Sequence, residues 1–218
     1  MRYRISKLLL FLILLFCGLN VNAQLSKTHY IPPLTSAEFG NANPEEQYFY
    51  ISTPSTKSIT YTITPVGQPS TSVITGLVSN TNPVEFYIGT GDGQLFASVD
   101  SQNMDPPEVG TVLVNKGYII EADDVIYVSL RMEAGGAQAG ALVSKGLSAL
   151  GTTFRVGSFT NQNPQDNYLN FVSVMATEDN TEVQFDDLPV GLTIENYSGT
   201  FPIIVNLDKG ESFIVATH

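Results

Sequence analysis

Residues 58 to 64 read SITYTIT, and this strict alternation constrains the fold more than any other feature of the sequence. In an extended strand, Ile59, Tyr61 and Ile63 share one face and the intervening threonines share the other. The segment is therefore predicted to be a strand with one buried face and one face toward water.

Similar short segments recur along the chain, rich in Val, Ile, Thr, Tyr and Phe and bounded by Gly, Pro, Asn or Asp. They read TSVITGLVS, VEFYIG, QLFASV, GTVLV, YIIEA, VIYVSLRM, TTFRVGSF, LNFVSVMAT, EVQF, GLTIE, FPIIVNL and SFIVAT. About a dozen strands at this spacing predict an all-β fold, specifically an antiparallel β-sandwich.

Three turns are predicted to join neighbouring antiparallel strands. Gly117 ends the three-residue loop of VNKGY, and Asp92 and Gly93 lie between two aromatic-rich segments. Asp179 and Asn180 form the third turn, in a hairpin that pairs residue 176 with residue 183.

Two regions lack the strand pattern. Residues 133 to 151 contain five glycines among many alanines, and they are predicted to form a long loop that crosses between sheets. Residues 24 to 47 contain Pro32, Pro33 and Pro44 and are predicted to be an irregular lead-in to one β-sandwich domain over residues 48 to 218.

The first 23 residues have the pattern of an export signal. Basic residues precede the apolar run LLLFLILLFCGL, which is too short to span a bilayer, and Val21 and Ala23 are the small residues expected before a cleavage site at Gln24. We therefore expect an exported protein whose mature chain is not inserted in a membrane. Lipidation at Cys17 is the alternative, although Phe16 is too large for that motif.

Removal of the signal leaves seven basic and 21 acidic residues, a net charge of −14. This charge opposes binding to nucleic acid and to anionic lipid. Because the single cysteine lies in the signal, the mature chain has no disulfide, thiol nucleophile or cysteine metal ligand. We expect no cofactor.

The stretch VMATEDNTEVQF is the main candidate for a metal or catalytic site, because it carries three acids and an asparagine between apolar runs. A calcium ion needs six or more oxygen ligands, and one hairpin tip offers about three. The stretch is therefore interpreted as a structural turn, with calcium binding as the alternative.

Catalytic patterns are sparse. His29 and His218, the only histidines, lie near the chain ends and are predicted to be solvated there, without a paired nucleophile or a zinc site. A pair of carboxylates for glycoside hydrolysis stays open as an alternative, although the chain lacks the tryptophan that most often stacks on sugars.

Three of the seven mature basic residues, Arg131, Lys145 and Arg155, fall on or beside the glycine-rich region. They would make a local positive spot on an acidic surface, and we take them as candidate ligand-binding residues. The alternative is that they lie on solvated strand faces without a role.

Three segments, NKGYIIEADDVIYVSLRM, LSALGTTFRVGSF and FVSVMATEDNTEVQF, resemble in order and spacing the N-terminal domain family of IgG Fc-binding proteins. The stretch from Ala176 to Val183 is the most specific part, and the resemblance covers roughly residues 110 to 218. It implies a β-rich, non-enzymatic module that is secreted or on the cell surface. Bacterial relatives look like large surface proteins of Gram-negative bacteria, some with gliding motility-associated C-terminal segments.

The sequence thus predicts a recognition or adhesion module that binds a protein or glycan partner through loops. A structural stalk segment and a secreted carboxylate-based enzyme are the alternatives. Because residues 213 to 217 read as a core strand with nothing after them to pair with, we also expect further domains of the same polypeptide beyond this chain.

Overall fold

A computed structural model gives the fold and describes residues 24–35, 44–91, 93–99, 107–134, 138–157 and 169–217. Fourteen strands lie in these ranges, and the prediction of an all-β fold is confirmed. The strands are β1 (Ser26–Ile31), β2 (Leu34–Thr35), β3 (Pro44–Ser52), β4 (Ile59–Pro65), β5 (Ile74–Val78), β6 (Val84–Gly89), β7 (Phe96–Ala97), β8 (Val112–Leu113), β9 (Tyr118–Ala134), β10 (Gln138–Val143), β11 (Asn170–Met175), β12 (Thr181–Phe185), β13 (Ile203–Leu207) and β14 (Ser212–Thr217). Two short 3-10 helices are η2 (Ser70–Ser72) and η3 (Gly146–Ala149).

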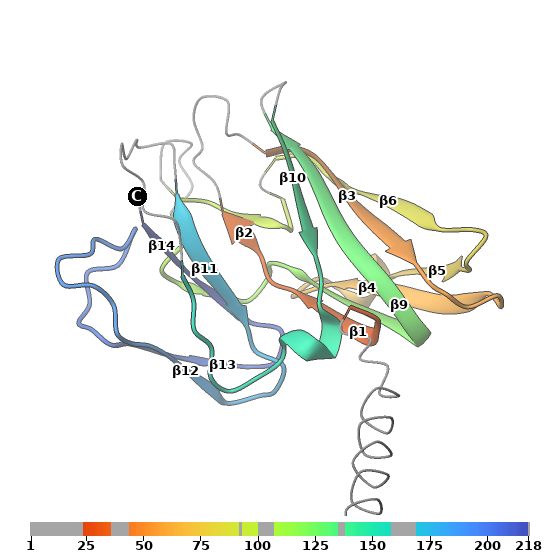
Figure 1. The fold of residues 1–218 in the computed structure, drawn as a ribbon. Coiled ribbons are helices and arrows are strands. Elements are labelled where there is room, and N and C mark those ends of the chain that lie inside the picture. Colours follow the sequence, from red (N-terminus) through yellow and green to blue (C-terminus); the bar gives the residue numbers. More distant parts are fainter. Residues whose placement is uncertain are drawn as a thin grey trace, which may run out of the picture.

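The 17-residue strand β9 organises the larger part of the fold (Figure 1). Its first half pairs with β1 and β4, and its second half pairs with β3 and β10; β5 extends the sheet beyond β4, and β6 extends it beyond β3. The sequence predicted two strands here, separated at Asp123 and Asp124. The structure instead has one strand, whose register with β1 is irregular around these residues.

The first core lies inside this sheet system. Ile59, Tyr61 and Ile63 are buried and the threonines between them are half-buried, as the alternation predicts. They pack in one apolar cluster with buried residues of β3 and β9, among them Phe49 and Ile120. Burial of this apolar surface is the main favourable term for the fold.

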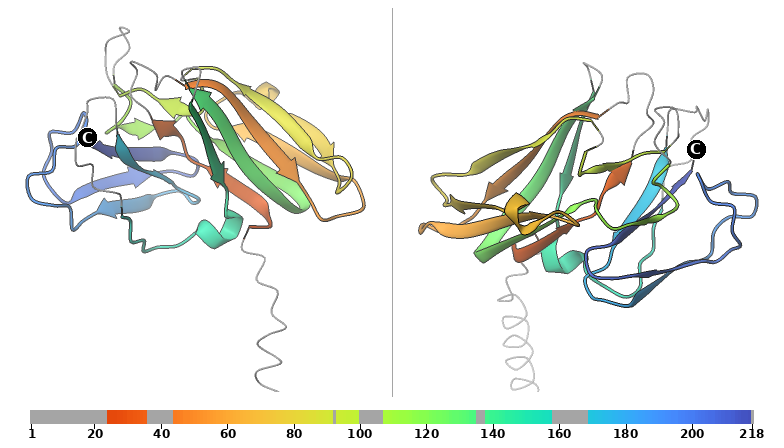
Figure 2. Two further views of the ribbon diagram at one scale, coloured as in Figure 1. Left: turned by 45° about the horizontal axis from the view of Figure 1, so that its top comes forward. Right: turned by 180° about the vertical axis from the view of Figure 1, so that it is seen from behind.

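The C-terminal part consists of two smaller sheets, β8–β14–β11 and β12–β13 (Figure 2). Phe213 and Val215 of β14 pack in a cluster with residues of β13, and Ile214 and Ala216 pack in a separate cluster with Leu113. In the described part of the chain no strand follows residues 213–217 to pair with them, but the expected exposed edge is wrong, because earlier strands cover it. Strand β14 pairs with β11 on one edge and β8 on the other, and the carbonyl of Ala216 accepts a hydrogen bond from the amide of Glu195 at 2.8 Å.

The three predicted hairpins do not form. Gly117 and Asn180 have the expected positive φ angles of 87° and 56°. However, β8 pairs with β14 instead of β9, and β12 pairs with β13 instead of β11. Strands β6 and β7 likewise pair with β3 and β2, and Asp92 lies outside the described residues. These turns connect different sheets.

Four other local predictions are wrong. Part of the glycine-rich region forms β10, since Gly140 and the alanines around it fit beside β9. The lead-in contains β1, β2 and the start of β3. Residues 152–157 and 191–195 contain no strand, although both alternate. The amide of Glu195 donates to the carbonyl of Ala216 in β14, but no ladder with β14 follows from it. Ser158 and Phe159, the end of the first of these segments, lie outside the described part.

Candidate interaction surface

The acidic stretch forms one of two adjacent crossings between the small sheets. Residues 176–180 lead from β11 to β12, and residues 208–211 lead from β13 to β14. The amide of Ala176 donates to the carbonyl of Glu211, and the amide of Gly210 donates to the carbonyl of Ala176, both at 2.9 Å. The two crossings therefore run side by side.

The carboxylates of these crossings accept backbone amides. Asp179 accepts from Lys209 at 3.0 Å, and Asp208 accepts from Asn180 at 3.0 Å and donates its own amide to the Glu211 carboxylate at 2.8 Å. Within the described ranges, no group of three or more His, Cys, Asp or Glu residues could hold a metal ion. The geometry supports a structural role for this stretch, although not the predicted hairpin.

His29 is not a solvated chain end, as the sequence had suggested, but is 0% exposed in the core. Its Nε2–H donates to the carbonyl oxygens of Ile126 at 3.0 Å and Ser26 at 3.2 Å, which fixes the tautomer because a carbonyl can only accept. The Ser144 hydroxyl then donates to Nδ1 at 2.8 Å. Burial lowers the pKa of His29, outweighing the two carbonyl contacts that raise it. His218 lies outside the described residues.

The three basic residues selected from the sequence lie on different elements. Arg131 is on β9 opposite Ala141 of β10, and its guanidinium carbon lies 5.8 Å above the ring centre of Tyr50. Lys145 follows β10, two residues beyond its last residue, Val143, and directly before η3. Arg155 lies in the exposed residues after η3. Lys145 and Arg155 thus lie before and after η3, and Arg131 belongs to the sheet face around Tyr50.

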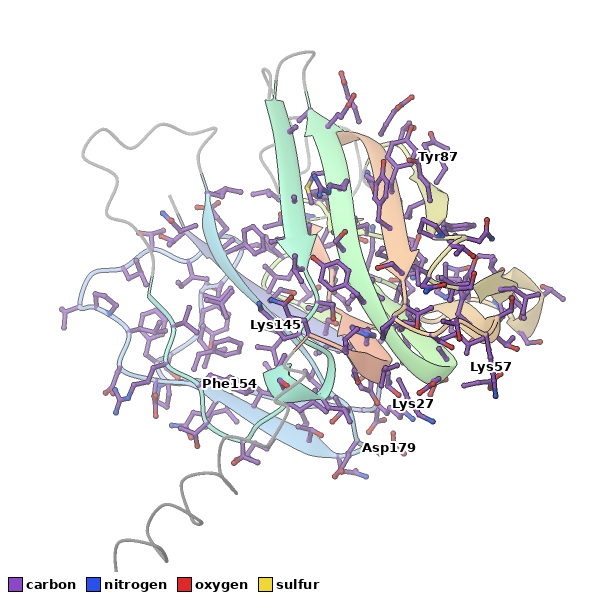
Figure 3. The ribbon with its side chains drawn as sticks, turned by 45° about the vertical axis from the view of Figure 1, so that its right-hand side comes forward. Lys27, Lys57, Tyr87, Lys145, Phe154 and Asp179 are labelled. Atoms are coloured by element: carbon purple, nitrogen blue, oxygen red, sulfur yellow. The ribbon has the colours of Figure 1, made fainter. Side chains whose placement is uncertain are left out.

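Residues 147–156, here called the apolar segment, are all exposed. Four large apolar side chains lie in it, with exposed fractions of 60% for Leu147, 40% for Leu150, 60% for Phe154 and 64% for Val156. Figure 3 shows Lys145 and Phe154 near η3, away from Tyr87. The sequence suggested this feature only through the alternation of Phe154 and Val156, which predicted a strand with one buried face.

The start of the apolar segment is fixed to the core. Gly146 is buried, and its amide donates to the Ser144 hydroxyl at 3.3 Å. The amide of Leu147 donates to the Ser26 hydroxyl at 3.4 Å. Since Ser144 also contacts His29, the buried imidazole connects β1 to the point where the apolar segment leaves the sheet.

An apolar cavity of about 300 Å³ lies beside β10. Its lining includes Leu34, Phe96, Met132, Leu142 and Phe171. Leu142 and Phe171, from β10 and β11, are themselves 49% and 37% exposed. This cavity is a second place where apolar surface of the C-terminal half faces solvent.

Comparison with known families places these features in context. Residues 139–218 match the family model described as IgG Fc binding protein. This match confirms the resemblance predicted from the sequence, over a shorter range than expected. The family is one of binding modules that are typically extracellular, and the apolar segment and Phe171 both lie in the matched region.

The comparisons with curated proteins and with solved structures gave no significant match. In the part of the chain that the structure describes, no helix is long and apolar enough to cross a membrane.

Proposed function

We propose that this protein is a non-enzymatic, exported recognition module that binds a protein partner through the apolar segment and two cations, Arg155 within the segment and Lys145 just before it. One observation carries the proposal. A ten-residue stretch inside the family-matched region exposes four large apolar side chains by 40 to 64%, namely those of Leu147, Leu150, Phe154 and Val156. Single exposed apolar residues are ordinary, but four large ones within ten residues of the chain favour an interaction site.

The chemistry of the segment describes its partner. Phe154 and Arg155 are residue types enriched at the energetic centres of protein interfaces. Lys145 and Arg155 are exposed cations on a chain whose mature net charge is strongly negative, so they favour a partner with carboxylates around an apolar patch. The anchored start of the segment at Gly146 limits the ordering cost of binding.

Export and surface display are part of the same proposal. They are supported by the basic and apolar pattern of residues 1 to 23 and by the typically extracellular location of the family. An immunoglobulin Fc fragment is the first protein to test as a partner, because the family description names it.

The test is biolayer interferometry of the chain from Gln24 against IgG Fc, mucin and a panel of glycans, with folding checked by circular dichroism. Phe154→Ala is expected to weaken binding by about 30-fold, the effect of losing a central interface residue. Val190→Ala is the matched control, because Val190 is fully exposed but lies outside the apolar segment.

Each outcome decides between the candidate functions. Saturable protein binding that Phe154→Ala weakens and Val190→Ala leaves unchanged supports the proposal. Absence of binding by a folded sample would favour a structural stalk and count against it. Turnover of chromogenic glycosides, abolished by one carboxylate substitution, would identify an enzyme instead.

A further inference from the structure

Another surface lies on the exposed face of the sheet, on β6, β3 and β9, and its residues precede the family-matched region. Tyr48 of β3 is directly opposite Tyr87 of β6 on one side and Arg131 of β9 on the other. Its ring centre lies 5.3 Å from that of Tyr87 and 6.4 Å from that of Tyr50. Tyr87 is 49% exposed and Tyr50 is 39% exposed. We call these three residues and Arg131 the tyrosine face.

Carboxylates surround the tyrosine face. The Tyr48 hydroxyl donates to Glu46 at 2.6 Å, and this hydrogen bond, with the nearby Glu85 charge, raises the pKa of Tyr48 to about 12. A hydrogen bond to Glu85 raises the pKa of Tyr50, and the charge of Glu133 adds to that effect. The raised pKa values of Tyr48 and Tyr50 thus indicate a negative local potential, which the positive charge of Arg131 only partly offsets at Tyr50.

The face already holds one cation. The Arg131 guanidinium lies 5.8 Å from the centre of the Tyr50 ring, within the range of a cation–π contact. Glu85 of β6 lies opposite Tyr50, so an aromatic ring and a carboxylate frame the space beside the guanidinium. Tyr87 is two residues from Glu85 on the same side of β6 and is more exposed than Tyr50.

We propose that the tyrosine face binds a protein partner through arginine side chains, which would stack on Tyr87 and pair with Glu85 and Glu133. Three carboxylates against one guanidinium make the face complementary to a cationic segment. Arginine fits better than lysine because its planar guanidinium can stack on a ring and pair with a carboxylate at once. The proposal is independent of the function proposed for the apolar segment.

The ring geometry disfavours a glycan on this face. The planes of Tyr50 and Tyr87 are tilted by 51° and 55° from that of Tyr48, so the three rings offer no common plane for a row of sugars. A separate arginine side chain needs only one ring and one carboxylate.

The experiment titrates the isotope-labelled chain from Gln24 with a short peptide that carries arginines spaced by glycines, followed by NMR. Peptides with lysine or glutamate in place of arginine are the matched probes. Tyr87→Ala should weaken binding of the arginine peptide by about fivefold, the effect of one exposed cation–π contact. Glu85→Gln with Glu133→Gln should weaken it further and reduce its dependence on salt.

A variant of equal charge separates this site from general attraction to an acidic protein. Glu121→Gln with Asp123→Asn removes two exposed carboxylates from the other half of β9. Unchanged affinity in this variant, with shifts concentrated around Tyr50 and Tyr87, supports the proposal. Equal weakening by both pairs of substitutions would overturn it, as would binding of neutral oligosaccharides to the tyrosine face without binding of the arginine peptide.

Discussion

Asp179 and Asp208 each accept a hydrogen bond from the turn that contains the other, both at 3.0 Å. Asp179 accepts from the amide of Lys209, and Asp208 accepts from the amide of Asn180. Because these residues belong to the two crossings between the small sheets, the pair holds the β11–β12 and β13–β14 connections together.

This relationship predicts that Asp179→Ala lowers the free energy of unfolding by about 1 kcal/mol, the usual effect of losing a side-chain cap on an exposed amide. Urea denaturation measures the change. Glu182→Ala removes a nearby exposed carboxylate on β12 and should change stability by less than about 0.5 kcal/mol. Equal losses in the two variants would show that the charge matters and the cap does not.

Calcium should leave the wild-type protein unchanged in the same measurement, because these carboxylates are directed at backbone amides. A calorimetric titration that shows tight calcium binding, lost in Asp179→Ala, would contradict this interpretation.

Lys116 contacts β7 and residues on both sides of it. It is 8% exposed, and its ammonium donates to the carbonyls of Gly93 at 2.8 Å and Phe96 at 2.7 Å and pairs with Glu108 at 3.0 Å. Lys116→Met keeps the apolar stem but leaves these acceptors without their cation. The free energy of unfolding should fall by about 3 kcal/mol, measured by urea denaturation.

Two comparisons control the Lys116 prediction. The exposed Lys57→Met should be nearly neutral, within about 0.5 kcal/mol. Combining Lys116→Met with Glu108→Gln should cost less than the sum of the single changes, because both lose the same ion pair. Strict additivity would contradict the pairing.

Local patterns in the sequence predict the faces of strands but not their partners. The alternation of Ile59, Tyr61 and Ile63 specifies which side is buried whatever strand lies alongside. Val183 and Phe185 also share a face whether β12 pairs with β11 or with β13, so the apolar pattern could not exclude the wrong hairpin. The positive φ of Asn180 was predictable, since it depends on one residue type, whereas the pairing is non-local.

The candidate surfaces show the same limit. Phe154 and Val156 alternate as in a half-buried strand, and only the absence of a neighbouring strand in the described structure leaves them exposed. The contact of Arg131 with Tyr50 joins residues far apart in the chain and has no local signal. The hydrogen bond of the buried His29 to the carbonyl of Ile126 likewise joins residues 97 positions apart.

His29 should make stability depend on pH. Because burial lowers its pKa in the folded state below the ordinary 6.5, the unfolded chain binds the proton more readily. Stability should therefore be complete above about pH 6.5 and fall as the pH drops below it, by at most about 1.4 kcal/mol per pH unit.

Urea denaturation of the wild type and His29→Gln between about pH 7.5 and pH 5.5 isolates this contribution, since carboxylates titrate mostly at lower pH. At the upper end of this pH range, His29→Gln should be less stable than the wild type. Between there and the lower end, it should lose less stability than the wild type does. Parallel pH profiles for the two proteins would show that His29 does not carry the effect.

Gly117 is predicted to tolerate no side chain, for two separable reasons. Its φ of 87° is a left-handed conformation, and an added Cβ would lie 2.6 Å from the Ile31 carbonyl oxygen. Gly191 has a similar φ of 83° but nothing within 4 Å of an added Cβ. Gly191→Ala should therefore lower the free energy of unfolding only through its strained φ angle, by about 1 kcal/mol. Gly117→Ala should lower it clearly more, because the Ile31 carbonyl at the end of β1 must also move. Equal losses for the two substitutions in thermal denaturation would contradict the close approach of residue 117 to β1.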